Sequence, residues 1–161
     1  IRPATIPGYM EKEWMDGVVY YQKEYPSLLF ARDGELYKLA GKSVLVIGGA
    51  YSVDKMYRIS HGYGWWPDEQ PSDEIKAYVE SQLDKNNWKV DIVLSHTVPL
   101  KYEPEEVFLL GINQMNVDKT TEIWLDSLED KLWYERWYAG HYHTEKKIDK
   151  LEILFENYAV L

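Results

Sequence analysis

Two short, mostly apolar runs constrain the fold of this chain more than any other feature. Residues 43–47 read Ser-Val-Leu-Val-Ile, and residues 90–94 read Val-Asp-Ile-Val-Leu. Consecutive apolar residues predict a strand that is buried on both faces, as in a sheet covered by helices. Between the two runs, Ile75, Val79 and Leu83 recur at the spacing of one helix face. Buried strands that alternate with helices predict an α/β fold.

The rest of the chain continues this alternation. We predict a helix that starts after Ser72, a second helix at about 121–131, and strands at 18–21, 136–139, around 148 and at 151–155. The Asp33-Gly34 pair between two apolar runs predicts a hairpin over residues 27–39. Residues 50–71 lack clear periodicity, which is typical of a long functional loop. A length of 161 residues predicts a single domain over 1–161.

The composition excludes several classes of partner. A net charge of −9 without a basic patch disfavours binding to double-stranded nucleic acid. No apolar run approaches the roughly 20 residues of a membrane helix, and no signal peptide is visible. Cysteine is absent, so neither a disulfide framework nor thiolate chemistry is available. We therefore expect a cytoplasmic protein without membrane or duplex partners.

Three of the four histidines follow predicted strands. His96 comes after one buried strand, and His141 and His143 come after another. Ligands of layered α/β folds gather at the carboxyl ends of the strands. Because residues i and i+2 of an extended segment point the same way, we expect both later histidines to face one site, with Gly140 letting the backbone bend. Converging imidazoles favour Zn, Mn or Fe over Mg or Ca.

The order of these motifs carries a resemblance. Val-Leu-Val-Ile-Gly-Gly-Ala occupies 44–50, Leu-Ser-His-Thr occupies 94–97 and Gly-His-Tyr-His occupies 140–143. In this order they resemble the second half of a calcineurin-like metallophosphoesterase of the small bacterial or phage type. GGAYSVDKMYR at 48–58 and WWPDE at 65–69 look close to one bacterial branch of that superfamily. The resemblance covers nearly the whole chain.

The resemblance implies a fold, a site and an activity. Its members are four-layer α/β/β/α sandwiches that hold two transition metals, usually Mn, Fe or Zn, and hydrolyse phosphate esters with metal-activated water. By position, His96 and His141 correspond to ligands of one metal and His143 to a ligand of the other. Two ions about 4 Å apart clamp a phosphoryl group and lower the pKa of the water between them. The implied substrate is a phosphoester of a small molecule, a nucleotide or a phosphoprotein.

The chain also departs from the family pattern. Asp-x-His, Gly-Asp-x-x-Asp and Gly-Asn-His-Asp/Glu precede these motifs in the family, and none of them occurs in this sequence. They supply the bridging aspartate, an asparagine ligand and the histidine that acts as general acid. We therefore expect this chain to be the C-terminal portion of a longer enzyme, incomplete by itself. On this hypothesis the general-acid histidine and the first strands lie upstream of Ile1, and that N-terminal segment is a partner.

Other candidates and alternatives remain open at this point. Arg58 is a candidate for binding a phosphate oxygen, and the alternative is a salt bridge that orders its loop. Asp91 is more typical of a solvated strand start than of a catalytic acid. The chain could instead be a truncated, non-catalytic interaction domain, with or without one bound zinc, or a mononuclear zinc hydrolase that uses three histidines.

Overall fold

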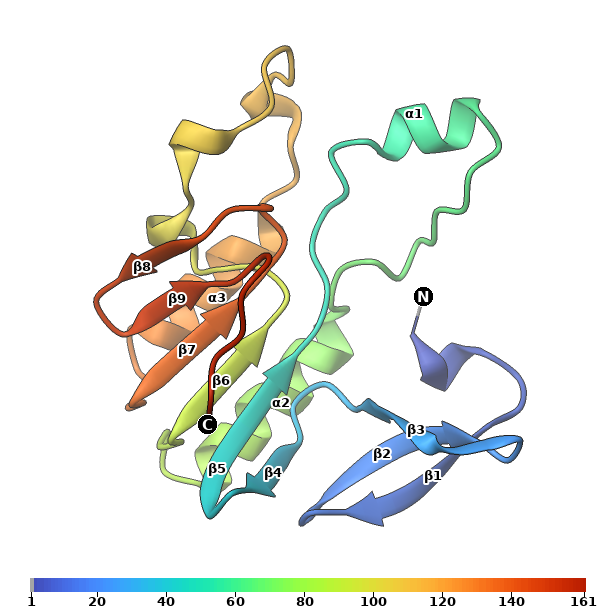
Figure 1. Ribbon diagram of the computed structural model, residues 1–161, viewed down its shortest axis with the longest axis vertical. Coiled ribbons are helices and arrows are strands. Elements are labelled where there is room, and N and C mark those ends of the chain that lie inside the picture. The colour runs from blue at the N-terminus through green and yellow to red at the C-terminus, as the bar shows by residue number, and fades with distance from the viewer. Residues whose placement is uncertain (1) are drawn as a thin grey trace.

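The computed structural model describes residues 2–161 and has two β-sheets and three α-helices (Figure 1). This confirms the predicted mixed α/β class. The large sheet has the strand order β4-β5-β6-β7-β9-β8. Its strands are β4 (Leu36–Leu39), β5 (Lys42–Ile47), β6 (Ile92–Ser95), β7 (Arg136–Ala139), β8 (Lys146–Ile148) and β9 (Leu151–Ile153). The four inner strands are parallel, and the edge strands β4 and β8 pair antiparallel to their neighbours.

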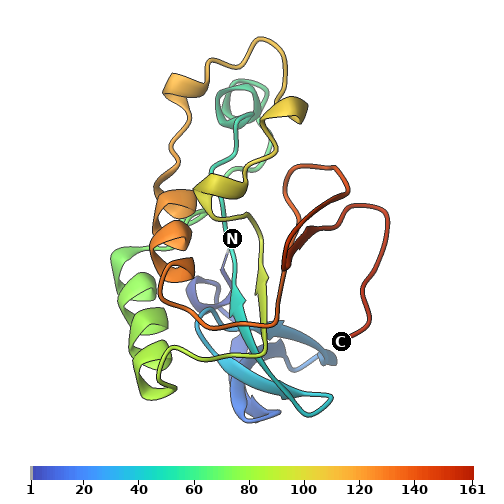
Figure 2. The ribbon, with the colours of Figure 1, turned by 90° about the vertical axis from the view of Figure 1, so that its left-hand side faces the viewer.

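Two helices cover one face of the large sheet, as both ribbon views show (Figures 1 and 2). They are α2 (Asp73–Lys85), whose first turn is capped by Ser72, and α3 (Thr120–Glu129). Leu83 of α2 and Leu125 of α3 are fully buried with Leu45, Val93 and Trp137 of the sheet in one core cluster. The helix ranges agree with the predicted ones because capping and apolar periodicity are local signals.

The opposite face of the large sheet is less covered. Side chains alternate along a strand, so the neighbours of the core residues point away from the helices. These neighbours include Val46, Leu94 and Tyr138, which are half-buried. The segment that follows β9 runs along this side of the molecule (Figure 2). The helices and the sheet therefore form two layers, and the sheet face that points away from the helices is only partly covered by the rest of the chain.

The small sheet lies beside β4, at the end of the molecule away from α1 (Figure 1). It is an antiparallel meander of β1 (Tyr9–Trp14), β2 (Gly17–Gln22) and β3 (Tyr25–Ala31). Tyr37 of β4 joins the two sheets, because its hydroxyl donates to the Val18 carbonyl at 2.6 Å and accepts from the Arg32 amide at 2.9 Å. The predicted strand at 18–21 is confirmed within β2.

The predicted hairpin over residues 27–39 is wrong. The strands β3 and β4 flank the Asp33-Gly34 turn, but β3 pairs with β2 and β4 pairs with β5. Gly34 has a φ of +85° and its amide donates to the Val46 carbonyl at 2.8 Å. The turn therefore redirects the chain from one sheet to the other, because its backbone bonds go to β5 instead of across a hairpin.

The remaining segments project beyond the carboxyl ends of the parallel strands. The predicted loop at 50–71 contains a short helix, α1 (Lys55–Ser60), and the segment 103–117 extends on the same side of the molecule (Figures 1 and 2). Four 3-10 helices complete the described elements: η1 (Pro3–Thr5), η2 (Leu100–Tyr102), η3 (Glu105–Val107) and η4 (Gln114–Asn116). No helix within residues 2–161 is long and apolar enough to cross a membrane.

Candidate active site

The carboxyl ends of β5, β6 and β7 meet at one edge of the large sheet. The backbone ladder continues past the strand ends, since the His96 amide donates to the Ile47 carbonyl and the Gly140 amide donates to the His96 carbonyl, both at 3.0 Å. His96 and His141, which follow β6 and β7, are thereby held side by side. The structure brings these two residues together as the strand pattern predicts.

A hydrogen bond joins the rings of His96 and His141, which meet in an edge-to-face arrangement. Nδ1 of His141 lies 3.2 Å from Nε2 of His96, and the ring centroids are 4.9 Å apart. His143 makes no such close contact with either ring and instead stacks on Phe155, with ring centroids 5.0 Å apart. It still lines the same cavity as His141 and lies near enough to lower the pKa of both other histidines. The three residues form one group, with His143 set apart from the close pair.

The backbone reaches this arrangement in an unexpected way. We expected an extended Gly-His-Tyr-His segment with a bend at Gly140. Instead, His141 has a φ of +70° and His143 a φ of +49°, so the two histidines themselves are left-handed. A Cβ at Gly140 would make only ordinary contacts, 3.8 Å from the Leu154 carbonyl oxygen and 3.9 Å from that of His96. The expectation of an extended segment is therefore wrong, because the turn that follows β7 begins at His141.

The environment keeps the paired histidines neutral at pH 7. Partial burial, together with the neighbouring His96 and His143, lowers the pKa of His141 to about 4. Surrounding protein atoms also lower the pKa of His96, although its ring stays open to solvent, and His143 adds to that shift. A neutral imidazole has a free nitrogen lone pair, which is the form that binds a metal ion.

The geometry of this pair fits two ligands of one metal ion. Zinc–nitrogen bonds of about 2.0–2.1 Å at a tetrahedral angle separate two ligand nitrogens by roughly 3.3 Å. The observed nitrogen separation of 3.2 Å is close to that value. Within the part of the chain that the structure describes, no group of three or more His, Asp or Glu side chains is arranged to hold a metal ion. The described residues thus supply two nitrogen atoms at the spacing of two ligands of one metal ion.

Two cavities open at this edge of the sheet. The larger one, of about 1070 Å³, extends past Gly48 and Gly49 at the end of β5 and includes His96. The smaller one, of about 550 Å³, includes His141 and His143. Arg58, at the last turn of α1, lines both. The histidine pair therefore lies where the two cavities approach each other.

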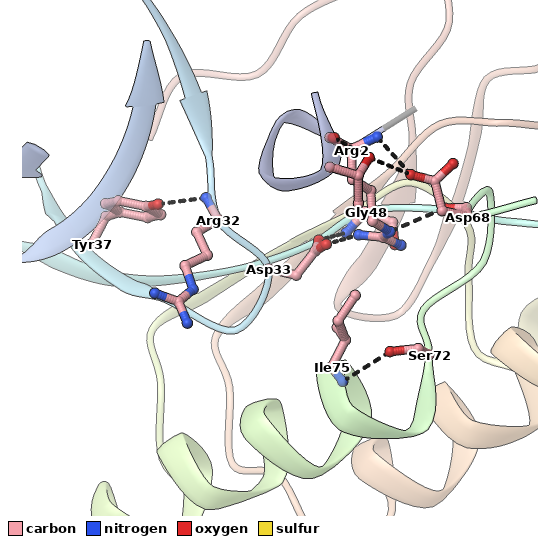
Figure 3. A network of polar contacts seen from close by, with 9 residues as sticks. Arg2, Arg32, Asp33, Tyr37, Gly48, Asp68, Ser72 and Ile75 are labelled. Atoms are coloured by element: carbon pink, nitrogen blue, oxygen red, sulfur yellow. Dashed lines mark hydrogen bonds and ion pairs between the residues drawn. The ribbon is translucent and has the colours of Figure 1, made fainter. Parts of the chain in front are cut away.

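Residues that line the larger cavity are joined by a network of polar contacts, which Figure 3 shows. Arg2 forms an ion pair with Asp33, and its guanidinium also donates to the carbonyls of Gly48 at 3.2 Å and Asp68 at 3.1 Å. The Asp33 carboxylate in turn accepts from the Gly48 amide. Gly49, with a φ of +99°, could not carry a Cβ, which would lie 2.4 Å from the Glu69 carbonyl oxygen. This network fixes the backbone at the carboxyl end of β5.

Arg58 forms contacts within its own loop, which is the alternative that the sequence offered to phosphate binding. Its Nε donates to Asp54 at 2.8 Å, and its Nη1 donates to the Gly64 carbonyl at 3.2 Å. Both members of the ion pair are more than 40 % exposed, so the pair contributes little to stability. A phosphate that enters either cavity could therefore compete for the guanidinium, and phosphate binding by Arg58 stays a prediction.

Sequence reasoning missed the acidic residue Glu122 of the smaller cavity. Glu122, in the first turn of α3, is only 4 % exposed, and burial raises the pKa of its carboxyl group. Among residues 2–161, its Oε2 atom has no hydrogen-bond partner. An acidic residue in the first turn of a helix normally indicates a surface position that complements the helix dipole. Nothing local in the sequence distinguishes Glu122 from that common case.

Comparisons with known proteins do not assign this chain to a family. No family model, no curated protein and no solved structure gives a significant match. The functional interpretation therefore depends on the motifs and on the geometry of the histidine group and its two cavities.

Proposed function

We propose that this chain carries part of the active site of a metal-dependent phosphoesterase related to the calcineurin-like enzymes. The observation that carries the proposal is the pair of neutral imidazoles, His96 and His141, with nitrogens 3.2 Å apart at the carboxyl edge of a parallel sheet. His143 lines the same cavity as His141 and would serve a second ion. The cofactors on this reading are two transition metals, Mn, Fe or Zn.

The chain's own residues would have separate tasks in this site. His96 and His141 would hold one ion, since the 3.2 Å between their nearest ring nitrogens is also close to the spacing of two ligands of one ion. Arg58 would contact a phosphate oxygen, because it lines both cavities and its present partner is an exposed carboxylate. The rigid turn at Gly48-Gly49 would form one wall for the phosphoryl group.

The proposed reaction is the hydrolysis of a phosphate monoester. A water oxygen forms a bond to phosphorus, the bond from phosphorus to the ester oxygen breaks, and a proton from the water ends on that oxygen. The products are an alcohol and inorganic phosphate. Bound metal ions would lower the pKa of the water and stabilise the negative charge on the transferring group.

The four-layer α/β/β/α sandwich belongs to this proposal as well. Its support is that α2 and α3 cover one face of the large sheet while the other face presents half-buried Val46, Leu94 and Tyr138. In a sandwich, this second face would pack on another sheet.

Metal binding by single-histidine variants tests the proposal. We expect His96→Ala and His141→Ala each to weaken Mn²⁺ binding at least about tenfold, measured by isothermal titration calorimetry. In the complete enzyme, both variants should also lose Mn²⁺-dependent hydrolysis of p-nitrophenyl phosphate. His61→Ala is the matched control, because His61 caps the end of α1 and bonds only to its own helix region. If His141→Ala kept full metal affinity and activity, the assignment would be wrong.

Metal stoichiometry separates the proposal from its alternatives. About two transition metals per chain, measured by elemental analysis, supports a dinuclear phosphoesterase. About one metal with hydrolysis supports a mononuclear zinc hydrolase. No metal, or about one without hydrolysis, supports an interaction domain. The interaction domain has one observation in its favour: α1 and the segment 103–117 expose large apolar side chains, among them Met56, Leu110 and Met115.

A further inference from the structure

The smaller cavity has an apolar wall. The segment 103–117 contributes Val107, Phe108, Leu109 and Ile112 to its lining, which also includes His141 and His143. Phe108 stacks on Tyr142 with ring centroids 6.2 Å apart, so part of this wall is aromatic. A volume of about 550 Å³ is within the usual range for a small-molecule site.

Several polar side chains also line this cavity, and of its acidic side chains Glu122 is the buried one. Glu122 lines the cavity and is 4 % exposed, and within the described chain its Oε2 atom lacks a hydrogen-bond partner. A buried polar atom without a partner costs free energy that a bound donor would recover. The nearby Lys119 does not fill this role, because its ammonium is paired with Glu103 at 2.6 Å.

We infer that this cavity, the leaving-group pocket, binds the ester side of the substrate, and that this group is aromatic and carries a hydroxyl or amine that donates to Glu122. The inference rests on the proposed function, since the phosphoryl group must lie at the histidines for its leaving group to reach the pocket. The aromatic part would pack against Phe108 and Leu109. The donor would satisfy the Oε2 atom of Glu122.

Binding of three phosphonates, which cannot be hydrolysed, tests this assignment. In the presence of Mn²⁺, we expect phenylphosphonate to bind about tenfold or more tightly than methylphosphonate, since burial of a ring contributes more than 1.4 kcal/mol. The 4-(aminomethyl)phenylphosphonate should bind more tightly again by about tenfold. Isothermal titration calorimetry measures all three affinities directly, without turnover.

Paired variants test the apolar wall and the contact with Glu122 separately. Leu109→Ser should remove most of the advantage of the phenyl group, whereas Leu110→Ser, at a fully exposed neighbour outside the cavity lining, should leave all three affinities unchanged. Glu122→Leu should remove only the advantage of the amine. If Glu122→Leu fails to fold by circular dichroism, Glu122→Gln serves instead, because loss of the charge alone should lower the advantage of the amine.

The outcomes distinguish this inference from the proposed function. Equal affinities for methyl- and phenylphosphonate, or no binding of either, would overturn the inference, as would equal effects of the two leucine variants. Hydrolysis of p-nitrophenyl phosphate decides the proposed function separately. Hydrolysis without a phenyl preference supports the proposed function and contradicts the leaving-group pocket. A phenyl preference without any hydrolysis supports the aromatic binding site and contradicts the phosphoesterase activity.

Discussion

The left-handed backbone at His141 and His143 is the most unusual residue-scale feature of the site. A non-glycine residue in this region costs on the order of 1 kcal/mol or more. Such conformations persist where surrounding contacts enforce them, and here the bond from the Gly140 amide to the His96 carbonyl fixes the start of the turn. The result is that His141 meets His96 while the ring of His143 turns to Phe155. The strained backbone of this turn therefore goes together with a His143 ring that lies apart from the pair of His96 and His141.

Arg58 provides a kinetic prediction at the same scale. We expect Arg58→Ala to raise KM for p-nitrophenyl phosphate about tenfold or more with a smaller change in kcat, because it removes a charged donor to a phosphate oxygen. Steady-state kinetics in Mn²⁺ measure both constants. Asp54→Ala is the informative control, since it releases Arg58 from its partner without removing the guanidinium. If both variants raised KM equally, Arg58 would only order its loop.

At the scale of elements, Asp91 joins the amino ends of β5 and β6, far from the histidines. Its carboxylate accepts from the Ser43 amide at 2.7 Å and from the Ser43 hydroxyl at 2.8 Å. The backbone bond first, and then the hydroxyl bond, hold the pKa of Asp91 below its usual value. This contact explains why the strand-start reading of Asp91 suits the structure better than a catalytic one.

This contact makes stability depend on pH in a defined direction. Because the folded-state pKa is lowered, the stabilisation is present above the unfolded pKa near 4 and is lost as pH falls through the folded value. We expect Asp91→Ala to lower the free energy of unfolding by about 1.5–3 kcal/mol at pH 7. The difference from the parent protein should shrink steadily below pH ~4, measured by urea unfolding. A difference that stayed constant down to pH ~2.5 would contradict this account.

The predicted elements and the failed hairpin differ in the range of the interactions that decide them. The helix after Ser72 and the strand at 43–47 depend on a cap and on apolar patterning, both of which are local. The Asp33-Gly34 turn carries the signal of a hairpin, but the partner of its Gly34 amide is Val46, in a different strand. A choice between two sheets is made by such long-range contacts, which the sequence pattern near the turn does not contain.

At the scale of the whole molecule, the same distinction separates the two parts of the candidate site. The meeting of His96 and His141 was predictable, since parallel strands bring their carboxyl ends to one edge whatever the details of packing. The burial of Glu122 and the ion pair between Arg2 and Asp33 could not be predicted in this way. Both depend on contacts between segments that are distant along the chain. The close-up of this network shows Arg2 reaching the turn, the strand end and the 65–71 loop together (Figure 3).

Arg2 should therefore be important for the stability of the whole molecule. Its side chain is 14 % exposed and that of Asp33 is 15 % exposed, so Arg2→Met would leave a largely buried carboxylate without its cation. We expect a loss of about 3–5 kcal/mol in the free energy of unfolding by urea, the usual cost of breaking a buried pair from one side. Lys42→Ala breaks the exposed pair with Glu135, with both side chains more than 40 % exposed, and should cost less than about 1 kcal/mol. Adding Asp33→Asn to Arg2→Met should recover part of the loss, because the unpaired charge is then removed. Equal losses in the Arg2 and Lys42 variants would mean that the Arg2 contacts in Figure 3 do not hold the Asp33 turn, the end of β5 and the 65–71 loop together.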